Sequence, residues 1–431
     1  MSPVASVRER SGAVLPVALS VATILVLYAL QIWIVDVTSA SGPHAVYAAT
    51  MIVCGALQSL ALLWLFRALA AGESRGYAWI VSGVAAMVLL SVVNAVNTDI
   101  DASAYIARAK LATWHDAYRP PPVSFHGNGF DVINVQWGPQ LPGNVYGPLW
   151  LLVDRIVVRP AHTYASALLS LRLCNVILLL GLLAALRGLG QPRHVVALVA
   201  LNPMLYFYYV VQAHNDLLAI VLVVAGTAIA DRRPLLGALV ASTAGLVKIS
   251  FVALATFAYA GRRDLRSSLL ALGLSGGMVL LISATFGGSD YFEAMRVMGL
   301  KQIAARGSTA HLTTIVLHVA VAGIAAGALL WAFVRGRFAA PATYSYATIS
   351  TIVYPWYLGW CIPYAVRAST FTAGFFISLP ALGHLIDPHF SVFTAHPFAV
   401  LDLCLIAVII WVGRAAWRTK AQGRLAMSAL S

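Results

Sequence analysis

The chain has 431 residues, of which 60% are hydrophobic and 10% are charged. A water-soluble domain carries about 25% charged residues, so the composition excludes that class of protein. The formal net charge is +13. No basic helix or aromatic platform lies outside the apolar segments, so we attribute this charge to the loops of a membrane protein and predict no nucleic-acid partner.

Apolar runs of about twenty residues recur along the chain and predict an all-α polytopic membrane protein. The first run follows Arg8 and Arg10 and is too long for the core of a signal peptide, so we expect it to remain as a span. The ten predicted full spans are 13–35, 46–66, 77–97, 162–186, 194–211, 213–230, 266–286, 312–334, 369–386 and 397–413.

Two further apolar segments have basic residues at both ends, which predicts that both ends face the cytoplasm. Residues 235–260 are too few to cross twice, because each arm would be about 18 Å long against a hydrocarbon core of about 30 Å. We therefore expect two short helices that meet near Lys248. Residues 341–366, which contain Pro355, are interpreted in the same way, as a second short-helix hairpin.

The positions of the basic loops leave two segments on the external side. The first, 98–161, contains an amphipathic stretch at Ala102–His115 and a short apolar helix at Tyr146–Val158. We expect both helices to lie in the membrane interface. The second external loop is 287–311. Together these features predict one transmembrane domain over residues 1–431, without a soluble domain.

Two groups of polar residues stand at the external ends of predicted spans. Asp99 and Asp101 follow the third span, and His214, Asn215 and Asp216 begin another. Helix capping and an acidic first turn would explain either group. One cap needs only one of the two acids, however, and both groups are predicted on the same face of the membrane.

Two cations lie inside apolar segments, Lys248 in the first hairpin and Arg172 in a span. Charged groups are costly in the hydrocarbon core, so such residues are usually functional or paired. A structural ion pair is the alternative for both. The tip of the second hairpin carries four aromatic residues, which form either an aromatic belt or a platform for a sugar or lipid headgroup. They are Tyr354, Trp356, Tyr357 and Trp360.

The order of several short motifs resembles the GT-C superfamily, integral-membrane glycosyltransferases that use polyprenyl-phosphate sugars. The motifs are "DASAY" (Asp101–Tyr105), "VYGPLW" (Val145–Trp150), "LNP" (Leu201–Pro203), "AHND" (Ala213–Asp216), the lysine-tipped hairpin and "PWY" (Pro355–Tyr357). Within the superfamily the chain is similar to actinobacterial polyprenyl-phosphomannose-dependent α-1,6-mannosyltransferases, over roughly residues 95–365. The loop "WHDAYRPPP" departs from the G-x-x-P-Y turn of many relatives, which leaves the acceptor contacts open.

The resemblance implies transfer of a monosaccharide, mannose before arabinofuranose or glucose, from a polyprenyl-phosphate donor to a cell-envelope glycan or glycolipid. The active site would lie on the external face of the plasma membrane, among membrane lipids. Asp101 would be the general base, with Asp99 as its orienting partner or as the base itself. Lys248 and Arg172 would stabilise the leaving phosphate. Two further candidates for that role, Arg306 and Lys301, are explained equally well by surface solvation.

The remaining candidates would contact the acceptor or the sugar: His214, Asn215, Asp216, Tyr146, Tyr354, Trp356 and Tyr357. No metal ligand and no cofactor is assigned. A divalent cation, Mg or Mn, is an alternative because Asp99, Asp101 and Asp216 carry the oxygen ligands that such ions prefer. The basic side chains would stabilise a phosphate without one.

Two other functional classes stay open on the sequence. A transporter or lipid flippase usually shows paired halves and broken helices at the bilayer midplane. This chain shows no obvious inverted repeat, and its unusual polar residues gather at one face. In a membrane-embedded structural or assembly protein, the same residues would only hold helices together.

Overall fold

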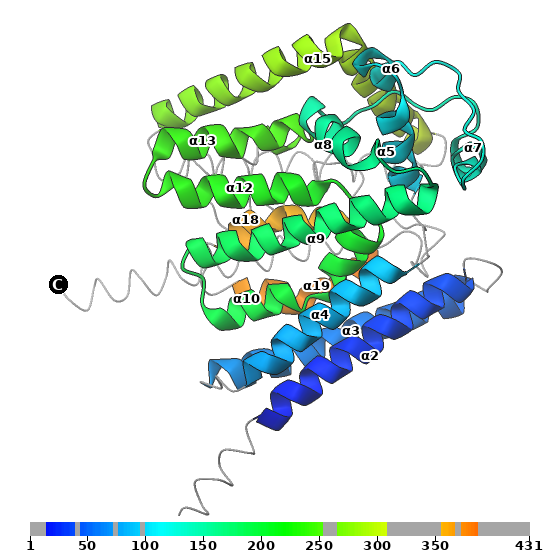
Figure 1. The fold of residues 1–431 in the computed structure, drawn as a ribbon. Helices are drawn as coiled ribbons and strands as arrows, with labels where there is room; N and C mark the ends of the chain where they lie inside the picture. Colours follow the sequence, from blue (N-terminus) through cyan, green and yellow to red (C-terminus); the bar gives the residue numbers. More distant parts are fainter. Residues whose placement is uncertain are drawn as a thin grey trace, which may run out of the picture.

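The computed structural model describes residues 14–38, 44–71, 76–94, 100–252, 265–307, 355–366 and 372–386. All regular secondary structure in these ranges is helical, as the composition predicts. Figure 1 shows the helices α9, α12 and α13 side by side, with α2, α3 and α4 at one edge of the bundle and α5 to α8 gathered at one end.

Three of the described helices are long and apolar enough to cross a membrane: α2 (Val14–Thr38), α3 (His44–Ala70) and α9 (Tyr164–Gly188). Each coincides with a predicted span. Three other predicted spans correspond to shorter apolar helices, α4 (Tyr77–Val93), α12 (Asp216–Ala230) and α19 (Thr372–Ile386). The spans predicted at 312–334 and 397–413 lie outside the described residues.

The predicted span 194–211 is broken near its middle, because its two helical parts meet at 45°. The elements are α10 (Arg193–Ala200), α11 (Pro203–Leu205) and the π-helix η2 (Tyr206–Val211). Pro203 cannot continue a helix that comes before it, since it has no N–H and clashes with the preceding turn. It starts α11 instead, where the side chain of Asn202 accepts a hydrogen bond from the N–H of Met204.

The first external segment folds into four short helices: α5 (Ile100–Lys110), α6 (Trp114–Tyr118), α7 (Asp131–Trp137) and α8 (Pro148–Val158). The expected interfacial stretch 102–115 is divided, because Thr113 and Asp116 form a capping box that starts α6. Residues 102–109 of α5 are all buried, against α7, α8 and α9. The small alanines of this stretch let α5 pack closely against these helices.

Helix α15 (Leu265–Gly307) joins the predicted span 266–286 to the predicted external loop 287–311. This loop is instead helical as far as Gly307, after a kink at Gly288 with φ 57° and ψ −152°. Glycine tolerates this backbone conformation because it has no Cβ atom.

The first arm of the predicted 235–260 hairpin comprises α13 (Pro234–Ser242) and the 3₁₀ helix η3 (Thr243–Leu246). Lys248 follows directly, at the expected break, whereas residues 253–264 lie outside the described part. The described end of the second hairpin comprises the 3₁₀ helix η4 (Pro355–Cys361) and α18 (Ile362–Ala365).

Candidate active site

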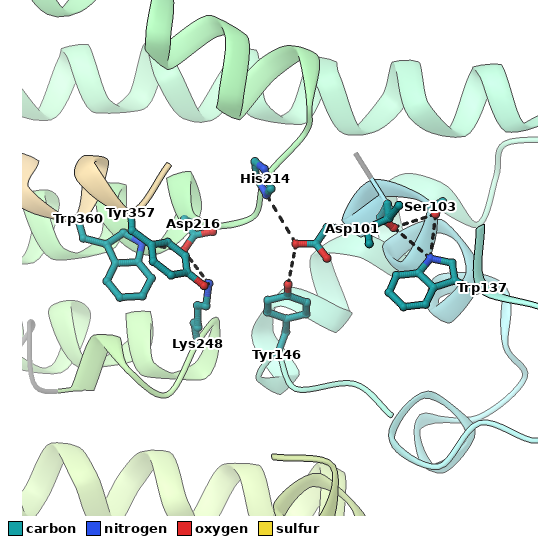
Figure 2. A network of polar contacts seen from close by, with 10 residues as sticks. Asp101, Ser103, Trp137, Tyr146, His214, Asp216, Lys248, Tyr357 and Trp360 are labelled. Atoms are coloured by element: carbon teal, nitrogen blue, oxygen red, sulfur yellow. Dashed lines mark hydrogen bonds and ion pairs between the residues drawn. The ribbon is translucent and has the colours of Figure 1, made fainter. Parts of the chain in front are cut away.

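Asp101 lies in the first turn of α5, where its carboxylate faces two side chains from other elements (Figure 2). The hydroxyl of Tyr146 donates to Asp101 Oδ2 at 3.3 Å. His214 Nδ1 lies 3.9 Å from the same oxygen. The side chain of Asp101 is 31% exposed, whereas that of His214 is fully buried. The carboxylate is thus positioned from the protein side and remains accessible to a substrate.

Tyr146 is a fixed, protonated donor to this carboxylate. Its burial and the negative charge of Asp101 raise the pKa of Tyr146 well above its usual value. The ring packs edge to face on Tyr105 at 5.2 Å, and Tyr105 packs on Trp150 at 5.3 Å. These contacts favour one orientation of the phenol, because T-shaped aromatic pairs are attractive in themselves.

His214 is oriented by its backbone and by a stacked ring. It follows Ala213, a buried residue with a φ of 58°, a conformation that costs a non-glycine residue about 1–2 kcal/mol. Its imidazole stacks on Trp356 with ring centroids 3.8 Å apart and 22° between the planes. The π-helix η2 precedes this turn, and such elements often occur at functional sites. The strained turn therefore points the imidazole at Asp101.

Lys248 lies in a second polar cluster that adjoins the first (Figure 2). Its ammonium nitrogen is 3.0 Å from Asp216 Oδ1 and 3.3 Å from the hydroxyl of Tyr357. The indole N–H of Trp360 donates to the same Asp216 oxygen at 2.7 Å. An ammonium group has three N–H donors. Described residues use two of them, and the Lys248 side chain is 16% exposed. Among the residues that the structure describes, none accepts a hydrogen bond from the third N–H.

Tyr146 joins the two clusters. Its hydroxyl reaches Asp101, and the centroid of its ring lies 5.6 Å from Lys248 Nζ. The same nitrogen lies 4.4 Å from the ring of Tyr357 and 5.0 Å from that of Trp360. Aromatic faces attract a cation, so the three rings hold the ammonium group beside the tyrosine that positions the acid.

A glycine explains why this junction is tight. The N–H of Gly147 donates to the carbonyl of Val247 at 2.9 Å, next to Lys248. A Cβ atom on Gly147 would lie 2.1 Å from the carbonyl oxygen of Leu246, a distance that no side chain tolerates. Pro148 then opens α8 at a position where the missing N–H is not needed. The motif "VYGPLW" thus brings the Tyr146 loop against the Lys248 loop.

Some predicted residues have a different environment from the one expected. Asp216 is 1% exposed and pairs with Lys248, so the described contacts are not those of an acceptor ligand. Asn215 is the buried N-cap residue of α12, but its side chain makes no capping hydrogen bond. The guanidinium of Arg172 donates to the main-chain carbonyls of Val211 and Asn94, which end η2 and α4.

The side chains of four other predicted site residues are outside those that the structure describes. Asp99 and Tyr354 lie outside the described residues. Arg306 and Lys301 belong to α15, but only its backbone is described there.

Arg108 is a buried cation near the site that was not among the predicted residues. It lies seven residues after Asp101 on α5, is 4% exposed, and donates to the carbonyl of Pro142 at 3.1 Å. Burial lowers its pKa, while the negative charges of Asp101 and Asp154 raise it. The helical spacing of Asp101, Tyr105 and Arg108 along one face was visible in the sequence.

The described residues do not provide a cluster of ligands for a divalent cation. No group of three His, Cys, Asp or Glu side chains among them lies close enough to hold a metal ion. One oxygen of Asp216 is bound by Lys248 and Trp360, and Asp101 lies in the other cluster.

A comparison against known protein families gives a match. Residues 11–261, more than half of the chain, match the MptA_B family model, described as "Alpha-(1->6)-mannopyranosyltransferase, N-terminal domain". Neither a curated protein nor a solved structure gave a match. The matched part contains Asp101, Tyr146, His214, Asp216 and Lys248. The chain therefore belongs to the alpha-(1->6)-mannopyranosyltransferase family, and it is a membrane mannosyltransferase of the GT-C type.

Proposed function

We propose that the protein transfers mannose from a polyprenyl-phosphate donor to a hydroxyl group of a cell-envelope glycan or glycolipid, with inversion at the anomeric carbon. The observation that carries this proposal is the position of Tyr146, which donates to the carboxylate of Asp101 and presents its ring to the ammonium of Lys248. The proposed reaction needs a general base and a cation that binds the leaving phosphate. Asp101 and Lys248, which both contact Tyr146, are suited to these two roles.

In the proposed step, Asp101 accepts the proton of the acceptor hydroxyl as that oxygen attacks the anomeric carbon. The bond from this carbon to the phosphate oxygen breaks, and its electron pair leaves with the lipid phosphate. The third N–H of Lys248 stabilises the charge that develops there. A single displacement of this kind inverts the configuration. Asp99, two residues before Asp101, remains the alternative base or an orienting partner.

Two other candidates act by positioning Asp101 and Lys248. His214 steadies Asp101, and Asp216 positions Lys248 instead of contacting the acceptor. Trp356 and Tyr357 form an aromatic wall for the sugar, to which we add Tyr354 on sequence grounds. The proposed sugar contacts also include Asn215.

The remaining cations have less direct roles. Arg172 donates a hydrogen bond to the carbonyl of Asn94 and so fixes the end of α4, the helix that comes before Asp99 and Asp101 in the sequence. We keep Arg306 and Lys301 as proposed contacts of the donor phosphate on sequence grounds.

The proposed arrangement has ten spans and two short hairpins in one domain over residues 1–431, with 98–161 and 287–311 on the external side. The basic loops support this sidedness. The enzyme would lie in the plasma membrane and take its lipid donor from the bilayer, with the active site on the external face.

The direct test is to incubate the purified protein with a panel of polyprenyl-phosphate sugars and an acceptor glycan, and to analyse the lipid phosphate released. We expect release with the mannose donor. Asp101→Asn should lower the rate by about 10²–10⁴-fold, the range of general base catalysis. Asp131→Asn is the matched control, because Asp131 is an exposed acid of the same segment on α7.

Two outcomes would contradict the proposal. Normal turnover by Asp101→Asn would remove its assignment as base, and the same variant at Asp99 would then be tested. Transport of the lipid-linked sugar across the proteoliposome membrane, without formation of a glycosidic bond, would favour the transporter alternative.

A further inference from the structure

A cavity of about 290 Å³ lies away from the candidate active site, between the start of α4, the end of α9 and α10. One part of its wall is apolar and includes Ile80, Val196 and Ala197. Another part carries the two arginines Arg187 and Arg193. The cavity thus combines positive charge with an apolar surface.

The two arginines have no acidic partner in the part of the chain that the structure describes. Both are exposed. Arg193 lies over the ring of Tyr77, 5.9 Å from its centroid, and this contact restricts the guanidinium without neutralising it. Arg67, in the last turn of α3, adds an exposed cation at the end of a neighbouring helix. The cavity therefore favours an anionic ligand.

The position of the cavity separates it from the active site. Helix α9 begins beside α5, where Lys110 donates to the carbonyl of Ala161, and ends in the turn that leads to α10 (Figure 1). Its 25 residues correspond to about 37 Å, which exceeds the thickness of the hydrocarbon core. Arg187 lies in the last turn of α9. The cavity is therefore at the opposite end of a membrane span from α5 and Asp101.

We propose that this cavity binds an anionic phospholipid of the leaflet at the basic end of the bundle. The headgroup phosphate would lie between Arg187 and Arg193, since guanidinium groups bind phosphate oxygens in a planar, bidentate way. The adjoining acyl chain would cover Val196, the half-buried residue of the apolar wall. Basic pockets between transmembrane helices are known to take such headgroups. A free phosphate would leave Val196 uncovered, so the lipid is the better match.

The test is native mass spectrometry of the full chain in detergent, titrated with phosphatidylglycerol or phosphatidylcholine. Two arginines should make binding of phosphatidylglycerol about thirtyfold stronger than binding of phosphatidylcholine. We expect Arg187→Gln with Arg193→Gln to lose most of this preference. The control variant, Arg232→Gln with Arg233→Gln, removes the same amount of charge from the turn between α12 and α13. It should keep the preference for the anionic lipid.

A second variant tests the apolar wall while keeping both arginines. Val196→Trp should fill the cavity and lower retention of either lipid. If it does not fold, the arginine variant still decides, because exposed side chains contribute little to stability. Equal retention of both lipids by the wild type would overturn the proposal, as would an unchanged preference in the arginine variant. Full competition by millimolar inorganic phosphate would identify a simple anion site instead.

Discussion

Lys248 Nζ lies 3.0 Å from Asp216 Oδ1, and the carboxylate of this pair is almost completely buried. The pair joins the loop after η3 to the first turn of α12, and Trp360 from η4 donates to the same oxygen. Three elements that are distant in the sequence therefore meet at one ion pair. Substitutions at this pair should therefore change the stability of the protein and its transfer activity in different ways.

Removing either partner alone should destabilise the protein by about 3–5 kcal/mol, because the remaining charge is buried without compensation. Lys248→Met and Asp216→Asn should each lower the thermal midpoint. The double variant should recover much of the loss, since no uncompensated charge remains, but should not recover transfer. The measurements are thermal unfolding in detergent and release of lipid phosphate. Transfer at the wild-type rate by the double variant would contradict a role for Lys248 at the donor phosphate.

Tyr146→Phe should separate the hydrogen bond to Asp101 from the packing of the ring. A hydrogen bond to a charged group is worth about 1.5–3 kcal/mol, so kcat/KM should fall about 10- to 100-fold, and the thermal midpoint should fall no more than the loss of one buried hydrogen bond explains. Tyr206→Phe is the control, because it also removes a buried hydrogen bond, to the carbonyl of Ala200 at 2.8 Å, in the bundle. Equal activities of the two variants would mean that the contact with Asp101 is incidental.

Gly147→Ala should push the Tyr146 loop away from the Lys248 loop, because the new methyl group would meet the backbone of Leu246. We expect lower stability together with loss of transfer, measured as in the previous variants. Gly188→Ala is the control: no atom lies within 4 Å of its added Cβ, and alanine favours a helix by up to about 1 kcal/mol. A fully active Gly147→Ala protein would show that the two loops do not need this close approach.

The stability of the protein should contain a pH-dependent contribution from Asp154. Burial raises the pKa of Asp154 well above its usual value, although the charges of Arg108 and Arg155 oppose the shift. Between the unfolded pKa, about 3.9, and the folded one, the folded state binds more protons than the unfolded state. Stability from this group therefore falls as the pH rises through that interval.

The measurement is the thermal midpoint between pH 4.5 and 8. Asp154→Asn should flatten the slope, whatever it does to the absolute stability. Asp116→Asn is the control, since hydrogen bonds from Thr113 lower the pKa of this half-buried acid and its titration lies below that range. An unchanged slope in Asp154→Asn would assign the dependence to another group.

Much of the architecture follows from local properties of the chain. The apolar runs at 13–35, 46–66 and 162–186 coincide with α2, α3 and α9, because a backbone in lipid has to satisfy its hydrogen bonds within a helix. The break near Lys248 was also predictable, since it rests on the length of the segment and the charges at its ends. The order of the motifs predicted the family that the comparison shows.

Contacts between distant residues were not open to the same reasoning. Burial of α5, the pairing of Asp216 with Lys248 and the close approach of Gly147 to Leu246 each depend on elements that only folding brings together. Hydrophobic periodicity reports one helix at a time, so it indicated which residues were unusual without showing which ones meet. Asp101 and Lys248 were recognisable from the sequence as an acid and a cation in unusual places, and only packing around Tyr146 made them neighbours in one site.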